Sequence, residues 1–403
     1  MKKNHFLKLA AMGLLLSTFA VTSCQKDVDL PLVSGEISEL ASADLKSYTL
    51  SFDVSDEFAG KELLGARAIF KNVATGQRYT VRAQSVTELT AELPEATYEV
   101  EISGYIKQLV NGKEKNRRVS VTKQLSPAFR SSSMASPFLL TLSSNPLADL
   151  KIEEIYFAGS GTNIRDQFFK ITNTALVPVW TDSLVIMEGS FLNTTQRVYT
   201  PAIMDTAFAI NSIWRVPNEF AELDTMASLV LVNQAQNHTG GLNLDNSDYL
   251  EWYNPGATND IDNTGVDNLI KVFCYTPNIW VLHNRGYRSY AIGFLPVSDS
   301  TFVSNYAYAP TYPNPVDSTK TMTVTNTFAF PNAWIVDGVN LSPTSEWVWN
   351  TLYSTIDDGY TGIDYDNNRF GKSVKRKKVS GVLVDTDDSS NDFTYGGSTA
   401  VAP

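Results

Sequence analysis

Histidine and cysteine are the side chains that most often bind transition metals or act as catalytic bases and nucleophiles. This chain of 403 residues contains only three histidines and two cysteines. His238 and His283 lie far apart in the sequence, so no spacing specifies a metal site. Folding could pair them in a haem or metal contact, which makes both candidate binding residues. For His238, which lies in a loop rich in Gln and Asn, we favour a hydrogen-bonded structural role.

Familiar catalytic motifs are absent from the sequence. It has no His-Glu-x-x-His helix, no Cys-x-x-Cys pair, no Gly-x-Ser-x-Gly elbow and no phosphate-binding glycine loop. We therefore expect a protein that is not an enzyme, with no catalytic residue, no metal site and no cofactor. A hydrolase remains the alternative, because folding can bring Asp and Glu pairs together without any sequence signature.

Two acidic loops raise the possibility of calcium binding. The segment 260–265 (Asp-Ile-Asp-Asn-Thr-Gly) begins like a calcium loop, but its twelfth position is Lys271 instead of the bidentate glutamate. The segment 364–369 has Arg369 where the sharp turn requires glycine, and Lys375 at its twelfth position. Neither is an EF-hand, and we interpret both as solvated turns, with an irregular Ca²⁺ site as the alternative.

A basic run and an aromatic segment are candidates for contact with a partner. Lys372 and residues 375–378 are basic, and we interpret them as an exposed strand that prevents edge-to-edge aggregation, with binding of an anionic partner as the alternative. Tyr306, Tyr308 and Tyr312 lie among Ala and Pro, in a stiff loop that could present their rings to a ligand or protein. The alternative is that these rings pack over the mouth of a sandwich.

The N-terminus has the features of an export signal. Three lysines precede an apolar run from Leu9 to Val21, which is too short to span a bilayer, and small residues then lead to Cys24. This pattern resembles the bacterial lipoprotein signal, which implies removal of residues 1–23 and lipidation of Cys24 as the membrane anchor. Cys274 lies in an apolar segment, and we expect it to be a buried core residue.

Residues directly after Cys24 refine this location. Gln25, Lys26, Asp27 and Asp29 resemble the short acidic signal that directs some Gram-negative lipoproteins to the cell surface. The chain without residues 1–23 has 29 basic and 43 acidic side chains, a net charge of −14, which disfavours nucleic acid as a partner. We therefore expect an outer-membrane, surface-exposed protein that is attached through its lipid.

Alternating apolar and polar residues predict an all-β protein. After a lipidated tether (24–45), Tyr48, Leu50 and Phe52 alternate with polar residues, and several similar segments follow. These predict a small antiparallel β-sandwich over 46–145. The segment 93–104 (Leu-Pro to Gly) resembles the closing strand of prealbumin-like, carboxypeptidase-regulatory-type domains.

The chain changes character after Pro146 and becomes rich in Asn, Thr, Trp and Tyr. Blocks at 152–161, 167–174 and 385–393 resemble the lamin-tail type of immunoglobulin-like sandwich, in which the last block is an Asp-rich strand. The resemblance implies a larger β-sandwich with long loops over 151–393, followed by a C-terminal tail at 394–403.

A further resemblance covers nearly all of 151–393. The segments 232–238, 331–339 and 368–377 resemble a domain-of-unknown-function family of surface lipoproteins found beside TonB-dependent outer-membrane receptors. This implies a binding lipoprotein that serves as an accessory to a TonB-dependent uptake receptor, with an unidentified small-molecule or glycan ligand. An adhesin or structural surface module without a transport role is the alternative.

Overall fold

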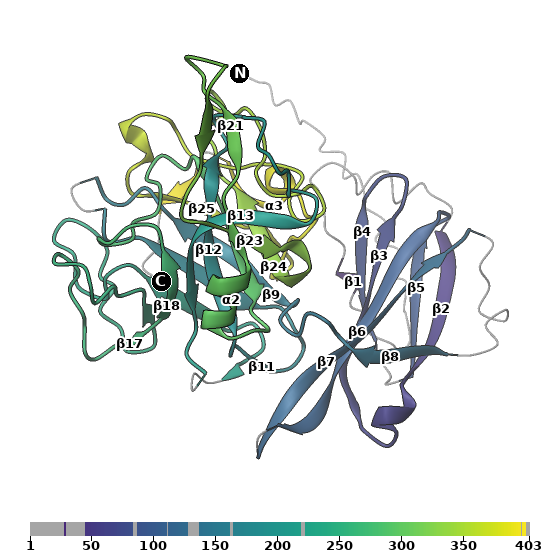
Figure 1. Cartoon of the computed structure of the whole chain (residues 1–403). Coiled ribbons are helices and arrows are strands. Elements are labelled where there is room, and N and C mark those ends of the chain that lie inside the picture. Colours follow the sequence, from purple (N-terminus) through teal and green to yellow (C-terminus); the bar gives the residue numbers. More distant parts are fainter. Residues whose placement is uncertain are drawn as a thin grey trace, which may run out of the picture.

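The computed structural model describes residues 28–29, 45–83, 87–110, 112–127, 137–161, 164–218, 222–395 and 397–399. Cys24, Gln25, Lys26 and Asp27 lie outside these residues, as does the leader expected at 1–23. Strands dominate the described part of the chain, which confirms the expected all-β class (Figure 1). Within these ranges no helix has the length and apolar character needed to cross a membrane.

The N-terminal part forms an eight-stranded sheet with the order β1-β4-β3-β6-β7-β8-β2-β5. Its strands are β1 (Val28–Asp29), β2 (Leu45–Val54), β3 (Leu63–Asn72), β4 (Arg78–Arg82), β5 (Glu88–Pro94), β6 (Tyr98–Val110), β7 (Lys113–Leu125) and β8 (Phe138–Leu142), and a 3₁₀ turn, η1 (Asp56–Phe58), follows β2. Only the β2–β8 pair among these is parallel. One end of this sheet, Val28–Asp29, comes from the segment expected to be a tether.

This sheet folds over to enclose its own core. Tyr48 of β2 lies 5.6 Å from Tyr98 of β6 and 6.3 Å from Phe70 of β3, measured between ring centroids. These strands belong to different arms of the sheet, so the arms face each other across buried aromatic rings. The sandwich predicted from the alternation in β2 therefore arises from one folded sheet.

The described residues from 150 onwards form two seven-stranded sheets. The first has the order β17-β16-β15-β10-β9-β25-β28, with β9 (Leu150–Tyr156), β10 (Phe168–Asn173), β15 (Ser228–Val232), β16 (Leu250–Glu251), β17 (Asp267–Asn268), β25 (Lys372–Lys375) and β28 (Ser398–Thr399). The second has the order β20-β23-β13-β12-β19-β24, with β18 also on β13; its strands are β12 (Leu184–Leu192), β13 (Ala207–Arg215), β18 (Ile270–Cys274), β19 (Arg288–Phe294), β20 (Ala307–Tyr308), β23 (Thr327–Pro331) and β24 (Ile335–Asn340).

Short elements connect these strands. Three two-stranded ribbons are formed by β11 (Val179–Trp180) with β14 (Glu222–Leu223), β21 (Thr311–Pro313) with β22 (Thr321–Thr323), and β26 (Lys378–Val379) with β27 (Val382–Leu383). The helical elements are α2 (Asp299–Asn305), α3 (Ser389–Asp392), η3 (Asn332–Trp334) and η4 (Asn367–Arg369). The segment expected to be an Asp-rich terminal strand is therefore partly the helix α3, and Asp388 caps its N-terminus by accepting a hydrogen bond from the Ser390 N–H.

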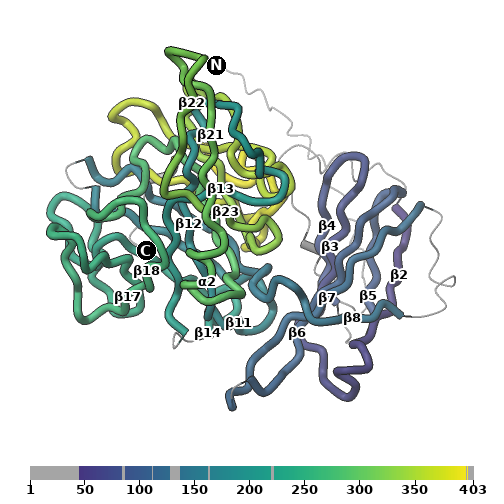
Figure 2. Tube along the Cα trace, in the orientation of Figure 1, coloured from purple at the N-terminus to yellow at the C-terminus, as the bar shows by residue number. Residues whose placement is uncertain are grey.

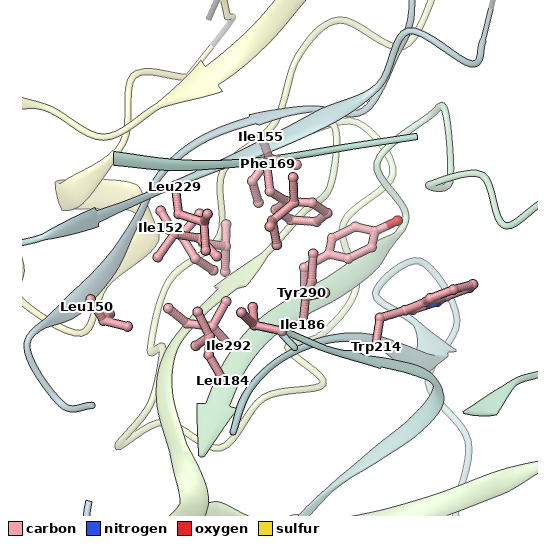
Figure 3. Close-up of a cluster of buried hydrophobic side chains, with 14 of the residues drawn as sticks. Leu150, Ile152, Ile155, Phe169, Leu184, Ile186, Trp214, Leu229, Tyr290 and Ile292 are labelled. Carbon is pink, nitrogen blue, oxygen red and sulfur yellow. The ribbon is translucent and has the colours of Figure 1, made fainter. Parts of the chain in front are cut away.

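Apolar side chains fill the space between the two large sheets (Figure 3). Phe169 from the first sheet and Tyr290 from the second lie 5.4 Å apart between ring centroids. Because side chains alternate along a strand, Leu184 and Ile186 of β12 face this core. The intervening Val185 and Met187 face a second core, which α2 covers with Phe302. Strand β12 is therefore buried on both faces.

The N-terminal sheet and the larger part of the molecule lie side by side (Figure 2). Charged side chains join them. Asp149 is 1% exposed and forms ion pairs with Arg67 and Arg118 of the N-terminal sheet. Tyr105 donates a hydrogen bond to the same carboxylate, and its ring belongs to the core of the larger sandwich. The two regions thus share both a buried charge cluster and apolar contacts.

The basic run is not uniformly exposed, and this part of the prediction is wrong. Arg376 is 4% exposed and donates hydrogen bonds to Asp337 at 2.6 and 2.8 Å and to Asp392 at 3.0 Å. Lys375 pairs with the buried Glu154, whereas Lys377 remains exposed. The basic run in the sequence does not reveal that Arg376 forms ion pairs with Asp337 and Asp392, which come from other segments of the chain.

Candidate functional site

The aromatic segment after α2 does not present its three tyrosines as one exposed loop. Tyr306 ends α2, and its half-buried ring stacks on Phe302 with 5.2 Å between centroids and lies 5.1 Å from Trp334. Tyr308 is only 7% exposed, and its hydroxyl donates a hydrogen bond of 2.6 Å to the Pro201 carbonyl. Tyr308 is therefore packed against the protein, as in the alternative, and its ring is not presented by an exposed loop.

Tyr312 and Tyr308 lie at a pocket that the sequence did not reveal. The pocket has a volume of about 220 Å³ and is lined mainly by apolar side chains. The lining residues are Phe191, Arg197, Val198, Tyr199, Ala202, Ile203, Met204, Ala207, Ala209, Tyr308, Trp349 and Thr351. We call this the aromatic pocket. Tyr312 borders it, because its ring lies 5.6 Å from that of Tyr199.

Strands of the second sheet form the base of the aromatic pocket. Phe191 extends from β12, Ala207 and Ala209 from β13, and Tyr308 from β20. Phe191, Ala209 and Tyr308 form a small buried cluster apart from the main core. Loops supply the other walls, through residues 197–204 and through Trp349 with Thr351. A site on a rigid sheet with loop walls is a typical arrangement for ligand binding.

Three aromatic rings define one wall of the pocket. Tyr199 stacks on Phe191 with 3.7 Å between centroids and 10° between planes. The ring of Trp349 lies 6.4 Å from each of them, within 27° of parallel. Trp349 is held by a 2.8 Å hydrogen bond from its Nε1 to the Leu192 carbonyl. The wall is therefore preformed, and binding on it would require little ordering of side chains.

Two polar groups give the pocket its electrostatic character. Burial raises the pKa of Tyr199 to about 12, so its hydroxyl stays protonated at neutral pH. Arg197 lies at the rim with its guanidinium carbon 4.7 Å from the centroid of the Tyr312 ring. Within the described residues Arg197 takes part in no ion pair. The pocket thus combines an apolar interior with one uncompensated positive charge.

The two candidate histidines have separate structural environments. His238 is 2% exposed, and its Nε2 lies 3.0 Å from the Gln234 carbonyl oxygen, which agrees with the structural role that we favoured. His283 stacks on Tyr287 with 4.9 Å between centroids. Burial and the positive charge of Arg288 lower the pKa of His283 to about 4, so it is neutral at pH 7. The Gln234 carbonyl beside His238 and the Tyr287 ring beside His283 are thus different partners for the two rings.

Two carboxylates, Asp260 of the first acidic loop and Glu251 of the neighbouring strand β16, accept hydrogen bonds from backbone N–H groups. Glu251 accepts hydrogen bonds from the N–H groups of Ala235 at 2.9 Å and Asn263 at 3.1 Å. Asp260 accepts from the Asn254 N–H at 2.8 Å and from the Gln234 side chain at 3.0 Å. In the part of the chain that the structure describes, no group of three or more His, Cys, Asp or Glu is placed to hold a metal ion.

Other segments singled out in the sequence also have structural contacts. Asp364 pairs with Lys372 at 3.0 Å, and Asp366 caps η4. Cys274 is half-buried, with its sulfur 3.7 Å from the Ser212 hydroxyl. Phe191, Tyr199 and Trp349 were missed as site residues, because they lie up to 158 positions apart and no local pattern joins them.

Comparisons with known proteins cover the part of the chain that contributes Tyr308, Trp349 and Thr351 to the aromatic pocket. A model of the family described as "Protein of unknown function (DUF4876)" matches residues 227–399. None of the curated proteins compared with the chain matches it. A crystal structure of a DUF4876 family protein from Bacteroides thetaiotaomicron VPI-5482 is 18% identical with a TM-score of 0.52, covering 88% of this chain and 96% of that chain. Residues 227–399 are thus similar to the DUF4876 family, and the chain shares the fold of a solved protein of that family.

Proposed function

We propose that this protein is a lipid-anchored binding protein on the outer face of the outer membrane, and that it serves as an accessory to a TonB-dependent nutrient receptor. In this proposal the aromatic pocket binds the ligand and no chemical step takes place. The observation that carries the proposal is the preformed stack of Tyr199 on Phe191 in a pocket of about 220 Å³. Such concave apolar sites with few polar groups are typical of small-molecule binding.

The location rests on the sequence around Cys24. Lipidation at this cysteine would attach the protein, and the acidic residues that follow resemble a surface-export signal. A surface protein with a pocket can deliver a captured ligand to a transporter beside it. The resemblance to lipoproteins encoded beside TonB-dependent receptors supports that partner.

The finer domain assignments belong to the same proposal. We assign the region 46–145 as a prealbumin-like spacer and the region 151–393 as a lamin-tail-like recognition domain. The ion pairs of Arg78 with Asp387 and of Lys115 with Asp182 join these regions, which supports a spacer that holds the recognition domain at a defined orientation.

Co-purification from native outer membranes tests the proposal. The tagged full chain is expressed in its own host, cross-linked on intact cells and purified, and its partners are identified by mass spectrometry. We expect a TonB-dependent receptor in near-stoichiometric amount. Cys24→Ala should abolish the association because the protein no longer reaches the membrane.

The contradicting outcomes separate the alternatives. Recovery without any receptor, together with saturable binding of the purified protein to other cells or matrix, would favour an adhesin. Unchanged growth on every nutrient after deletion of the gene, with no receptor recovered, would also refute the uptake role.

A further inference from the structure

We infer that the aromatic pocket selects a planar aromatic ring carrying a carboxylate, with the ring in the pocket and the carboxylate on Arg197. This inference rests on the binding role proposed above and names the ligand class of the same site. Three properties of the pocket carry it: its size, the use of its polar atoms, and the uncompensated charge at its rim.

The size of the pocket favours one small ring system. An apolar cavity of about 150 Å³ accommodates benzene, and drug-sized ligands usually occupy about 300 Å³ or more. The volume of about 220 Å³ lies between these values. A single substituted ring or an indole therefore fits, whereas an oligosaccharide extends beyond the pocket.

The polar atoms of the lining are mostly engaged elsewhere, which disfavours a sugar ring. Trp349 donates its Nε1 hydrogen to the Leu192 carbonyl, and Tyr308 donates its hydroxyl hydrogen to the Pro201 carbonyl. The Thr351 hydroxyl lies 2.6 Å from that of Ser289. A buried sugar would leave several hydroxyls without hydrogen-bond partners, which is unfavourable. An aromatic ring needs no such partners and can stack on the wall formed by Tyr199 and Trp349.

Arg197 supplies the specificity for an anion. Its guanidinium lies over the ring of Tyr312, and this contact restricts the side chain. A planar guanidinium binds a carboxylate through two parallel hydrogen bonds. The chain carries a net charge of −11, so its overall field repels anions and the selectivity has to come from this local group.

Binding of indole-3-propionate to the purified protein, measured by titration calorimetry, tests the inference. Indole-3-propionamide serves as the uncharged probe, 3-cyclohexylpropionate as the non-aromatic acid and methyl glucoside as the sugar. We expect the indole acid to bind at least tenfold more tightly than both its amide and the cyclohexyl acid, and methyl glucoside not to bind. Equal affinity for the acid and its amide, preference for the sugar, or no binding of either indole probe at millimolar concentration would overturn the inference.

Three variants assign the effect to residues. Arg197→Gln should reduce the preference for the acid over the amide to less than threefold, and it should fold normally because Arg197 is only partly buried and forms no ion pair among the described residues. Lys107→Gln removes the same charge from an exposed position on β6 and should retain the tenfold preference. Ala202→Trp adds bulk at an exposed position of the lining and should weaken both indole probes. Retained preference in Arg197→Gln, with an unchanged melting temperature, would contradict the assignment.

The outcome is separable from that of the proposed function. Receptor recovery from membranes is measured without added ligand. Receptor association without selectivity for the indole acid would overturn only the ligand class, whereas selective binding without a receptor would overturn only the uptake role.

Discussion

The ring of Tyr199, from a loop, lies 3.7 Å from the ring of Phe191, from strand β12, with 10° between their planes. A loop is thereby fixed against the sheet by stacking, and Trp349 extends the same aromatic surface. This relationship gives the pocket its wall. It also separates tyrosines that maintain the fold from those that border the pocket, and this distinction can be tested.

Tyr308 should contribute to stability far more than Tyr312. Tyr308→Ala removes a buried ring and should lower the free energy of unfolding by about 3 kcal/mol or more. Tyr308→Phe removes only the hydrogen bond to Pro201 and should cost about 1 kcal/mol. Tyr312→Ala is the comparison, with an expected loss of about 1 kcal/mol or less, since its contact with Arg197 is partly exposed. Chemical denaturation measures all three, and equal losses for Tyr308→Ala and Tyr312→Ala would contradict the assignment.

Arg376 should be essential for stability although it lies in a basic run. Arg376→Met leaves Asp337 and Asp392 buried without their cation, which should cost about 3–5 kcal/mol. Lys377→Met, at the exposed neighbouring position, should change stability by about 0.5 kcal/mol or less. Melting temperatures of the two variants provide the measurement. If both variants melt like the parent, the buried cluster does not hold these segments together.

Glu251 should make the folded protein less stable as the pH rises. Burial, reinforced by the nearby charges of Asp260 and Asp262, raises the pKa of Glu251 to about 7. Between about pH 4.3 and 7 the folded state binds a proton that the unfolded state lacks. The resulting stability is fully present below about pH 4.3 and is lost as the pH rises through 7. Glu251→Gln should remove this slope, whatever its absolute stability, in denaturation curves recorded from pH 5 to 8.

His283 should make the folded protein less stable as the pH falls, the opposite of the effect of Glu251. Its pKa is lowered to about 4 by burial and by Arg288, so the unfolded state binds the additional proton between about pH 4 and 6.5. The stability present above about pH 6.5 is therefore lost as the pH falls toward 4. NMR titration of the imidazole carbon signals should show no protonation above pH 5. A midpoint near 6.5 would show that the ring is exposed and available as a cation.

Membrane attachment should depend on Cys24, and exposure at the cell surface should depend on the residues that follow it. Cys24→Ala should leave a protein that does not sediment with the outer membrane, because the apolar run before it is too short for a stable span. Changing Lys26, Asp27 and Asp29 to alanine should preserve membrane attachment but reduce digestion by protease added to whole cells. Membrane association of the Cys24→Ala variant in a strain without the receptor would falsify the anchor.

Local patterns in the sequence were sufficient to predict much of the fold. The alternation of Tyr48, Leu50 and Phe52 with polar residues predicted a half-buried strand, and β2 has that burial pattern. Local patterns could not predict which distant segments pair with one another. Asp-rich residues near the C-terminus became α3, because capping by Asp388 and the burial of Asp392 beside Arg376 decide the local conformation there.

The sequence by itself determined the all-β class, because side chains of successive strand residues point to opposite faces and the pattern is local. The prediction of lipidation at Cys24 also rests on the sequence alone, because the residues that resemble the signal are contiguous. Only the tertiary structure decided that Tyr308 is buried, that Arg376 meets Asp337 and that Phe191, Tyr199 and Trp349 form one wall. The physical reason is that burial, ion pairing and ring stacking depend on distances between segments. These distances are set by the pairing of distant strands, and no local spacing in the sequence encodes them.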